Sequence, residues 1–213
     1  MLPVFAAVVV TNTFAAQDPS IDRLLGKLPP PEKFVDPAIS DPLAKQMEAA
    51  AKAHNFGIAL DASRRLANRY PKSLGAQMVH GMLAAFLRRF PEATAAYHKA
   101  LAIRPDFAGA YAAMGMAEIL QQHYRVALSD FQKVTHLAPK ADVGWIGASA
   151  CAEKLGRRQE SLEYARQATS ITPSSAGAWS QLAREEGLSG NKQASAKALA
   201  RARQLDKTAP QRP

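Results

Sequence analysis

The chain has 213 residues, 47% of them hydrophobic, and a formal net charge of +9. This length suits one large domain or one repeat array, and the apolar share is sufficient for a sizeable core. A single cysteine, Cys151, excludes an intramolecular disulfide. Because the basic residues are scattered along the chain rather than clustered, the charge favours solvated helix faces over a nucleic-acid surface.

Residues 1–16 have the pattern of a secretory signal peptide. The stretch from Met1 to Val10 is almost wholly apolar, and small residues lead up to the polar Gln17. This run is shorter than the roughly 20 residues that span a membrane, but it fits the hydrophobic region of a signal. We therefore predict cleavage near Ala16, an extracytoplasmic protein (periplasmic or secreted) and no membrane span in the mature chain. Because no basic residue precedes Arg23, an apolar segment that packs on a cytoplasmic domain is the alternative.

Residues 17–39 predict one short helix followed by a proline-rich linker. The apolar residues of the helix have the spacing of a single face: Ile21, Leu24, Leu25 and Leu28. Three prolines from Pro29 end the helix, and further prolines keep the following stretch extended. So short a helix cannot bury its apolar face alone, so it must dock on the domain, a partner or a membrane surface.

The rest of the chain repeats with a period of 34 residues. Prolines stand at Pro71, Pro105, Pro139 and Pro173. Small residues precede these prolines, and the next place in the series, by twelve positions: Ala59, Ala93, Ala127, Ser161 and Ser195. Apolar residues precede the same five places by five positions: Leu66, Ala100, Val134, Ala168 and Ala202. A large aromatic recurs at Tyr111, Trp145 and Trp179. Agreement at several positions predicts repeated structural units.

Each unit is expected to hold two antiparallel helices joined by a tight turn. The small residue lies where the helices cross, because only Ala or Ser lets the two backbones approach. Bulky side chains at Tyr97 and Phe131 fill the space between neighbouring units. Gly156 and Gly190 occupy matching turn positions, where a left-handed residue would end the first helix.

This pattern resembles the tetratricopeptide repeat (TPR), which implies an all-α, right-handed α-solenoid of tandem helix-turn-helix repeats. The resemblance covers five units, at residues 40–73, 74–107, 108–141, 142–175 and 176–209, with a tail at 210–213. Gly81 and Gly115 match the family's glycine position, whereas Gln77 and Leu43 replace its aromatic residue. The atypical first and last units fit the ends of a solenoid, where one side faces water.

The sequence predicts no catalytic, metal or cofactor site, so we do not expect an enzyme. No histidine pairs with another His, Cys or carboxylate at the i, i+4 spacing of a helical metal site. His80 falls at an inward position, while His54 and His123 fall near turns. Glu185 and Glu186 are adjacent on a helix and point in different directions, which makes a poor acid–base pair.

The family resemblance also implies a concave groove lined by the first helix of every unit. The predicted lining is apolar and rich in methionine, which adapts to varied partners. It comprises Met78, Met82, Phe86, Ala112, Met116, Ile119, Leu120, Val143 and Ile146. Basic residues lie only at its two ends, at Lys45 and Arg184, so the clamp with which some family members hold a chaperone's C-terminal carboxylate is not supported.

Three functions remain open at this stage. The first is a scaffold that binds a protein or peptide in the groove. The second is a self-assembling protein, a homo-oligomer, whose groove is filled by its own N-terminal helix or by another copy. The third is a basic nucleic-acid-binding solenoid, which requires a cytoplasmic chain and strongly salt-dependent binding. We favour the first and expect no nucleic acid.

Overall fold

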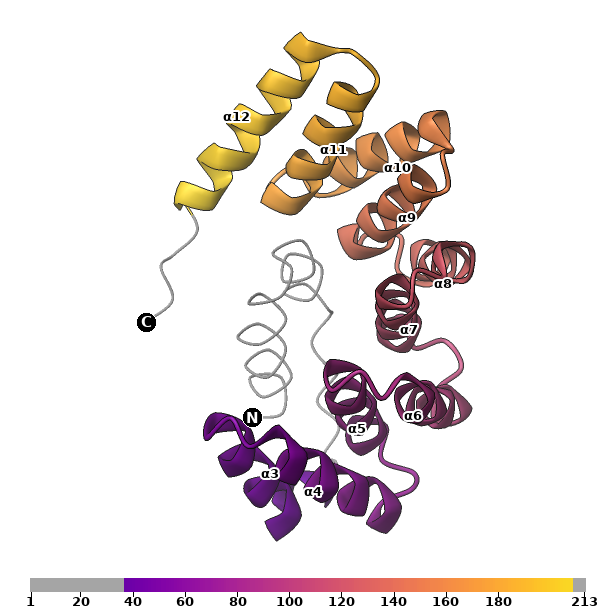
Figure 1. Ribbon diagram of the computed structural model, residues 1–213, viewed down its shortest axis with the longest axis vertical. Helices are drawn as coiled ribbons and strands as arrows, with labels where there is room; N and C mark the ends of the chain where they lie inside the picture. Colours follow the sequence, from indigo (N-terminus) through magenta and orange to yellow (C-terminus); the bar gives the residue numbers. More distant parts are fainter. Residues whose placement is uncertain (1–36, 209–213) are drawn as a thin grey trace. The chain divides into compact units, whose positions relative to one another are not determined.

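The computed structural model describes residues 37–208 of the chain, and the side chains of residues 38–206. The predicted signal peptide and the short helix around Leu24 lie outside these residues. Within them the chain is wholly helical, which confirms the predicted fold class (Figure 1). None of the helices in this range combines the length and the apolar composition needed to cross a bilayer.

One 3-10 helix and ten α-helices make up the described chain. They are η1 (Pro37–Ser40), α3 (Pro42–Lys52), α4 (Phe56–Arg69), α5 (Leu74–Phe86), α6 (Phe90–Ile103), α7 (Ala108–Leu120), α8 (Tyr124–Leu137), α9 (Asp142–Lys154), α10 (Arg158–Ile171), α11 (Ala176–Leu188) and α12 (Lys192–Thr208). The predicted linker is therefore not extended to its end, since its last three residues belong to η1.

The helix starts repeat with the predicted step of 34 residues. The second helices of the pairs begin at Phe56, Phe90, Tyr124, Arg158 and Lys192. From α5 onward the first helices follow the same step, at Leu74, Ala108, Asp142 and Ala176. Helix α3 departs from this step and begins at Pro42, where Asp41 caps it and accepts a hydrogen bond from the Leu43 amide at 2.8 Å.

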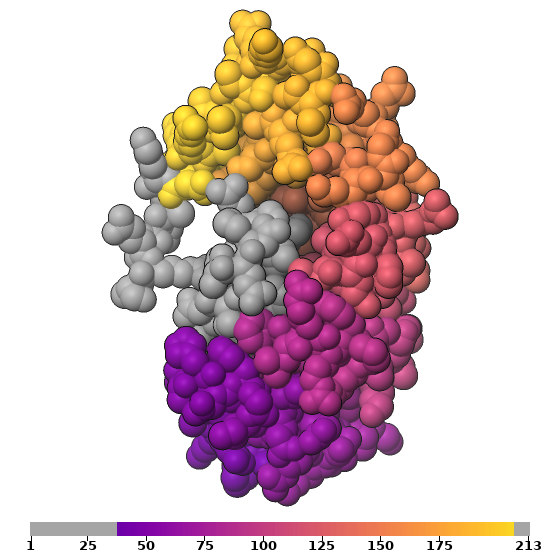
Figure 2. Space-filling view, in the orientation of Figure 1, coloured from indigo at the N-terminus to yellow at the C-terminus, as the bar shows by residue number. Residues whose placement is uncertain are grey.

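The helices fall into two compact units. Unit 1 runs up to Ala117 and contains η1, α3 to α6 and most of α7; unit 2 contains the last turn of α7 and α8 to α12. Within each unit, helices that follow one another pack together, as α3, α4, α5 and α6 do in unit 1, and α8 to α12 in unit 2. The space-filling view shows these neighbouring helices in close contact on the face drawn (Figure 2).

The predicted small positions lie at the helix crossings. Ala59, Ala93, Ala127 and Ser161 have no exposed surface, whereas Ser195 is half-buried. The bulky position is equally well packed, with Tyr97 at 2% and Phe131 at 0% exposure. The Tyr97 ring lies against Gly81 and the Phe131 ring against Gly147, so close that a Cβ atom on either glycine would collide with the ring. Absent side chains therefore set the depth at which these aromatics pack.

A left-handed residue follows the first helix of every pair. Gly156 and Gly190 have φ of 74° and 83°, as predicted. The equivalent residues one, two and three repeats earlier are not glycines, but they take the same conformation: His54, Arg88 and Gln122, with φ of 57°, 57° and 63°. The tight turn thus forces three ordinary side chains into a region that costs roughly 1–2 kcal/mol for most residues.

The repeated aromatic position ties each first helix to the proline loop before it. The indole N–H of Trp145 donates to the carbonyl of Pro139 at 3.0 Å, and that of Trp179 donates to Pro173 at 2.8 Å. Gln77, at the same position, donates to the carbonyl of Ala67 at 3.0 Å. The glutamine that departs from the aromatic pattern therefore keeps its function as a donor to the preceding loop region.

Candidate binding surface

The predicted groove residues of unit 1 lie on the first helices α5 and α7. Met78 and Met82 on α5 are each 8% exposed, and Met116 on α7 is 6% exposed. Ala112 is completely buried and Phe86 is half-buried. Ala112 therefore belongs to the packing between helices, whereas the methionines and Phe86 keep a small accessible edge.

Helix α5 is apolar around most of its circumference. All residues from 76 to 85 are buried, and a helix of this kind packs against neighbours on more than one side. Phe86 ends it and meets Phe56 of α4 edge-on, with ring centroids 4.8 Å apart. The methionine side chains therefore sit on a rigid helix whose position is fixed by its neighbours.

In unit 2 the predicted lining residues divide in the same way. Ile119 and Leu120 are half-buried in the last turn of α7. On α9, Val143 is 2% and Ile146 is 8% exposed. Val143 thus packs between helices, and Ile146 resembles the methionines of unit 1 in its slight exposure.

A Ser–His–Glu array in unit 1 was not predicted from the sequence. The Ser63 hydroxyl lies 3.1 Å from Nδ1 of His80, whose Nε2 lies 3.4 Å from Oε1 of Glu92. The three residues come from α4, α5 and α6. The histidine was predicted to be a core residue, and it is 7% exposed. Burial lowers its pKa, and the charge of Glu92 opposes that shift.

This array cannot work as a nucleophilic site on an outside substrate. Ser63 is 1% exposed, and its hydroxyl already donates to the carbonyl of Leu60 at 2.7 Å. Ser63 stands where the next two repeats have Tyr97 and Phe131, and the imidazole of His80 packs beside this smaller residue. The signal in the sequence was this departure at the bulky position, opposite an inward histidine.

A second buried polar cluster joins α9, α10 and α11 in unit 2. Glu185 has no exposed surface. Its Oε1 accepts from the Gln181 amide at 2.9 Å, and that amide also reaches the Ser149 hydroxyl at 3.1 Å. Oε2 has no donor. Burial, with the neighbouring carboxylate of Glu153 opposing ionisation, raises the pKa of Glu185 to about 7.

A proton on Glu185 accounts for the atom that lacks a donor. Glu153 lies within hydrogen-bonding reach of Glu185, and Arg184 holds it in a bidentate pair at 2.7 and 2.8 Å. A protonated Oε2 can donate to this ionised neighbour, which satisfies both groups. Glu186 turns the other way, to Arg166 at 2.9 Å, as expected for adjacent residues on a helix.

The remaining chemistry of the described chain is sparse. Residues 37–208 hold no cluster of three or more His, Cys, Asp or Glu side chains placed to bind a metal. The thiol of Cys151 is buried, which raises its pKa to about 12 and keeps it in its unreactive form.

Comparison with known proteins identifies the fold. No protein-family model matches the chain, and no curated protein matches it. Solved structures of MamA, an all-helical protein of TPR-like fold, do match. One crystal structure of MamA has a TM-score of 0.65 at 15% identity, covering 76% of this chain and 94% of its own. Another, MamA 41-end from Desulfovibrio magneticus RS-1, has a TM-score of 0.66 at 15% identity, covering 79% and 95%. At this identity the likeness establishes the fold of tandem helix pairs alone.

Proposed function

We propose that this protein is a non-catalytic scaffold of five TPR repeats that binds a protein or peptide on the methionine-rich face of its first helices. The fold supports an interaction scaffold in general, because stacked helix pairs present long surfaces for other chains. The described chain offers buried polar clusters but no accessible nucleophile paired with a base. Binding is the function that such a surface serves best.

The observation that carries the proposal is the placement of Met82 and Met116. The two residues are 34 positions apart on the first helices α5 and α7, both within unit 1. Each keeps 6–8% of its surface exposed, whereas Ala84 and Ala112 on the same helices have none. Methionine is flexible and polarizable, so two of them at equivalent positions can fit apolar side chains of different shapes.

The charge distribution supports a protein partner over nucleic acid. Seven arginines of the described chain lie within 4.0 Å of an Asp or Glu carboxylate: Arg64, Arg65, Arg69, Arg89, Arg157, Arg166 and Arg184. Phosphate recognition requires basic groups that are free to replace counterions. Much of the net positive charge is thus compensated locally.

The test is capture of the native partner by the double variant Met82→Gln with Met116→Gln. Glutamine keeps the length of methionine but disfavours apolar contact, so partner capture from the native compartment should fall strongly. The matched control, Met82→Leu with Met116→Leu, conserves volume and apolarity and should retain capture. Equal capture by both double variants, with helical content unchanged, would refute the proposed surface.

The oligomeric state separates this function from self-assembly. We expect the mass in solution to be independent of protein concentration when no partner is present. A mass that rises with concentration, and falls in the glutamine double variant, would show that another copy occupies the surface. We further infer secretion through residues 1–16, and N-terminal sequencing of the native protein should find Gln17 first rather than Met1.

A further inference from the structure

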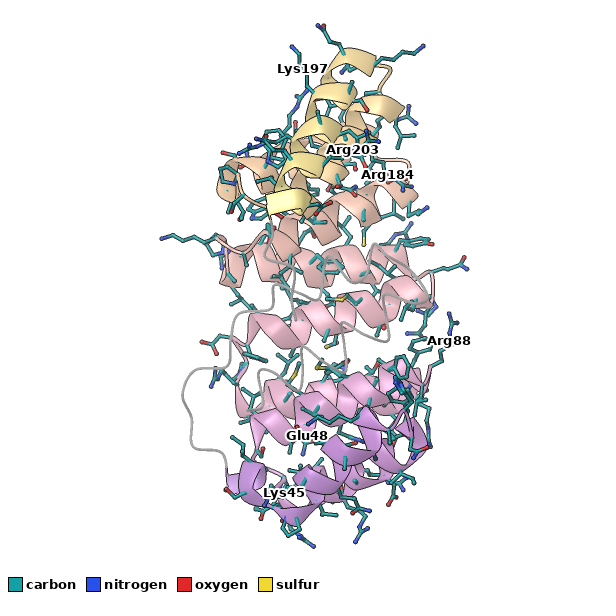
Figure 3. All side chains as sticks on the ribbon, turned by 90° about the vertical axis from the view of Figure 1, so that its left-hand side faces the viewer. Lys45, Glu48, Arg88, Arg184, Lys197 and Arg203 are labelled. Atoms are coloured by element: carbon teal, nitrogen blue, oxygen red, sulfur yellow. The ribbon has the colours of Figure 1, made fainter. Side chains whose placement is uncertain are left out.

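A small apolar pocket opens at the beginning of unit 1, where η1, α3, α4 and α5 meet. Its volume is about 170 Å³. Apolar side chains form most of its wall: Ala38, Ala44, Met47, Leu66, Ala76 and Val79. Two charged residues of α3, Lys45 and Glu48, also line it and project from that helix in Figure 3. A cavity of about 150 Å³ with apolar walls can admit one benzene-sized ring.

The following repeat shows what fills the equivalent space. Ala44, Lys45 and Glu48 correspond, 34 residues later, to Met78, Val79 and Met82, all buried in the apolar core. Ser73, before α5, corresponds to Phe107 before α7. The Phe107 ring lies against Gly109, packs on the cluster that contains Met78 and Met82, and has the guanidinium carbon of Arg104 5.4 Å from its centroid. The first repeat has smaller or charged residues where the second has two methionines and a phenyl ring.

The charges at the pocket indicate the sign of its ligand. Glu48 is paired with Lys52 at 2.8 Å, so its charge is compensated. Lys45 is exposed, and the described residues offer it no ion pair. An ammonium group beside an apolar cavity favours a ligand that combines an apolar side chain with a neighbouring carboxylate.

We propose that this pocket binds a phenylalanine-sized side chain of a partner peptide, with an adjacent acidic residue paired to Lys45. The inference rests on the proposed binding function and names the chemistry of one contact. The incoming ring replaces the side chain that Phe107 supplies one repeat later. The acidic neighbour gives direction to the bound peptide, because the apolar cavity alone does not distinguish its two ends.

Direct binding of synthetic peptides to the full chain tests the proposal. The probe is a fluorescein-labelled, alanine-based nonapeptide with one phenylalanine between two aspartates, measured by fluorescence anisotropy. One comparison peptide has alanine in place of phenylalanine, and another has lysines in place of the aspartates. We expect saturable binding of the probe and at least roughly tenfold weaker binding of the other two.

Two variants locate the binding. Lys45→Glu changes an exposed residue, so folding should survive, and it should weaken the probe roughly three- to tenfold while improving the lysine peptide. Ala44→Leu fills the pocket and should weaken the probe roughly tenfold or more. The matched controls are Lys140→Glu, with the same charge change in unit 2, and Ala49→Leu, on an exposed face of α3. Both controls should bind the probe as the unmodified chain does.

The proposal is overturned if the probe does not saturate, if phenylalanine makes no difference, or if Ala44→Leu binds as well as Ala49→Leu. A dimer that Ala44→Leu dissociates would also overturn it, because the occupant would then be a second copy. Partner capture keeps this inference separate from the proposed function. If Ala44→Leu captures the native partner normally while the Met82/Met116 glutamine variant does not, the scaffold function stands and the pocket assignment fails.

Discussion

Units 1 and 2 share one 34-residue plan but close their helix crossings differently. In unit 1 the crossing residues Ala59 and Ala93 are apolar and fully buried. In the last two pairs of unit 2 the crossing residues are serines that donate to a carbonyl twelve residues earlier, Ser161 to Ser149 at 2.8 Å and Ser195 to Ala183 at 2.6 Å. The crossing requires a small side chain, and a hydroxyl is accepted where a carbonyl can receive its proton.

The two units also bury opposite titratable groups. Unit 1 holds His80 among α4, α5 and α6, and unit 2 holds Glu185 among α9, α10 and α11. Burial disfavours the charged form of each, which is the acid form of histidine and the base form of glutamate. The difference teaches that one repeat architecture can respond to pH in two directions.

The largest expected effect separates the two units through their bulky positions. Tyr97→Ala should cost roughly 3–5 kcal/mol, because the ring is buried against Gly81 and the cavity cannot fully collapse. Phe131→Ala is its counterpart in unit 2. Hydrogen exchange should accelerate in α5 and α6 for the first variant, with little change in α11 and α12. Equal acceleration in both units would show that they do not open independently.

The next effect concerns Glu185. Its pKa in the folded chain, about 7, lies above the ordinary value of 4.5, so folding takes up a proton and stability falls as pH rises between these values. Glu185→Gln supplies a neutral amide that can donate to Glu153, and should stabilise the protein by roughly 1–3 kcal/mol at pH 8. At pH 4 the gain should vanish. Denaturant unfolding at the two pH values measures it, and an equal gain at both would contradict the assignment.

A smaller effect is expected at the left-handed turns. Unit 2 has Gly156 and Gly190 there, whereas unit 1 has His54 and Arg88. Arg88→Gly relieves an unfavourable φ of 57° and should raise the stability by about 1 kcal/mol. Gly156→Ala should lower the stability by a similar amount. A thermal shift of the same sign in both variants would exclude backbone strain as the cause.

The smallest effect concerns His80, because Glu92 partly offsets the desolvation of the imidazole. Its pKa in the folded chain is below the ordinary 6.5, so folding releases a proton and stability is lost as pH falls below about 6.5. Exchange in α5 should therefore accelerate on acidification, in contrast to α11. In His80→Gln this acceleration should disappear; if it persists, another group causes it.

The sequence was sufficient for the repeat period because that signal is local and repeated. Pro71 and its equivalents, Gly156 and Gly190 each mark a turn by their own backbone preference. The left-handed conformation of Arg88 was not predicted, since its side chain does not favour that region and only the register requires it. The contacts of His80 and Glu185 were also missed, because they depend on which helix faces meet in space.

The candidate surface was predictable only in part. The spacing of Met82 and Met116 follows from the period, but the sequence could not tell that Ala112 and Val143 are turned into the packing between helices. A helix that is apolar on nearly every side, such as α5, gives a weak signal for which face is accessible. The pocket beside Lys45 depends on smaller residues in the first repeat and becomes visible only when the repeats are compared in space.

Oxidation of methionines with and without the native partner tests the central claim most directly. Dilute peroxide converts accessible methionines to sulfoxides, which mass spectrometry assigns residue by residue. We predict that the bound partner slows oxidation of Met82 and Met116, while Met47, which is 2% exposed in the core, oxidises slowly in both states. Unchanged oxidation of Met82 and Met116 under saturating partner would contradict the claim that this face is the binding surface.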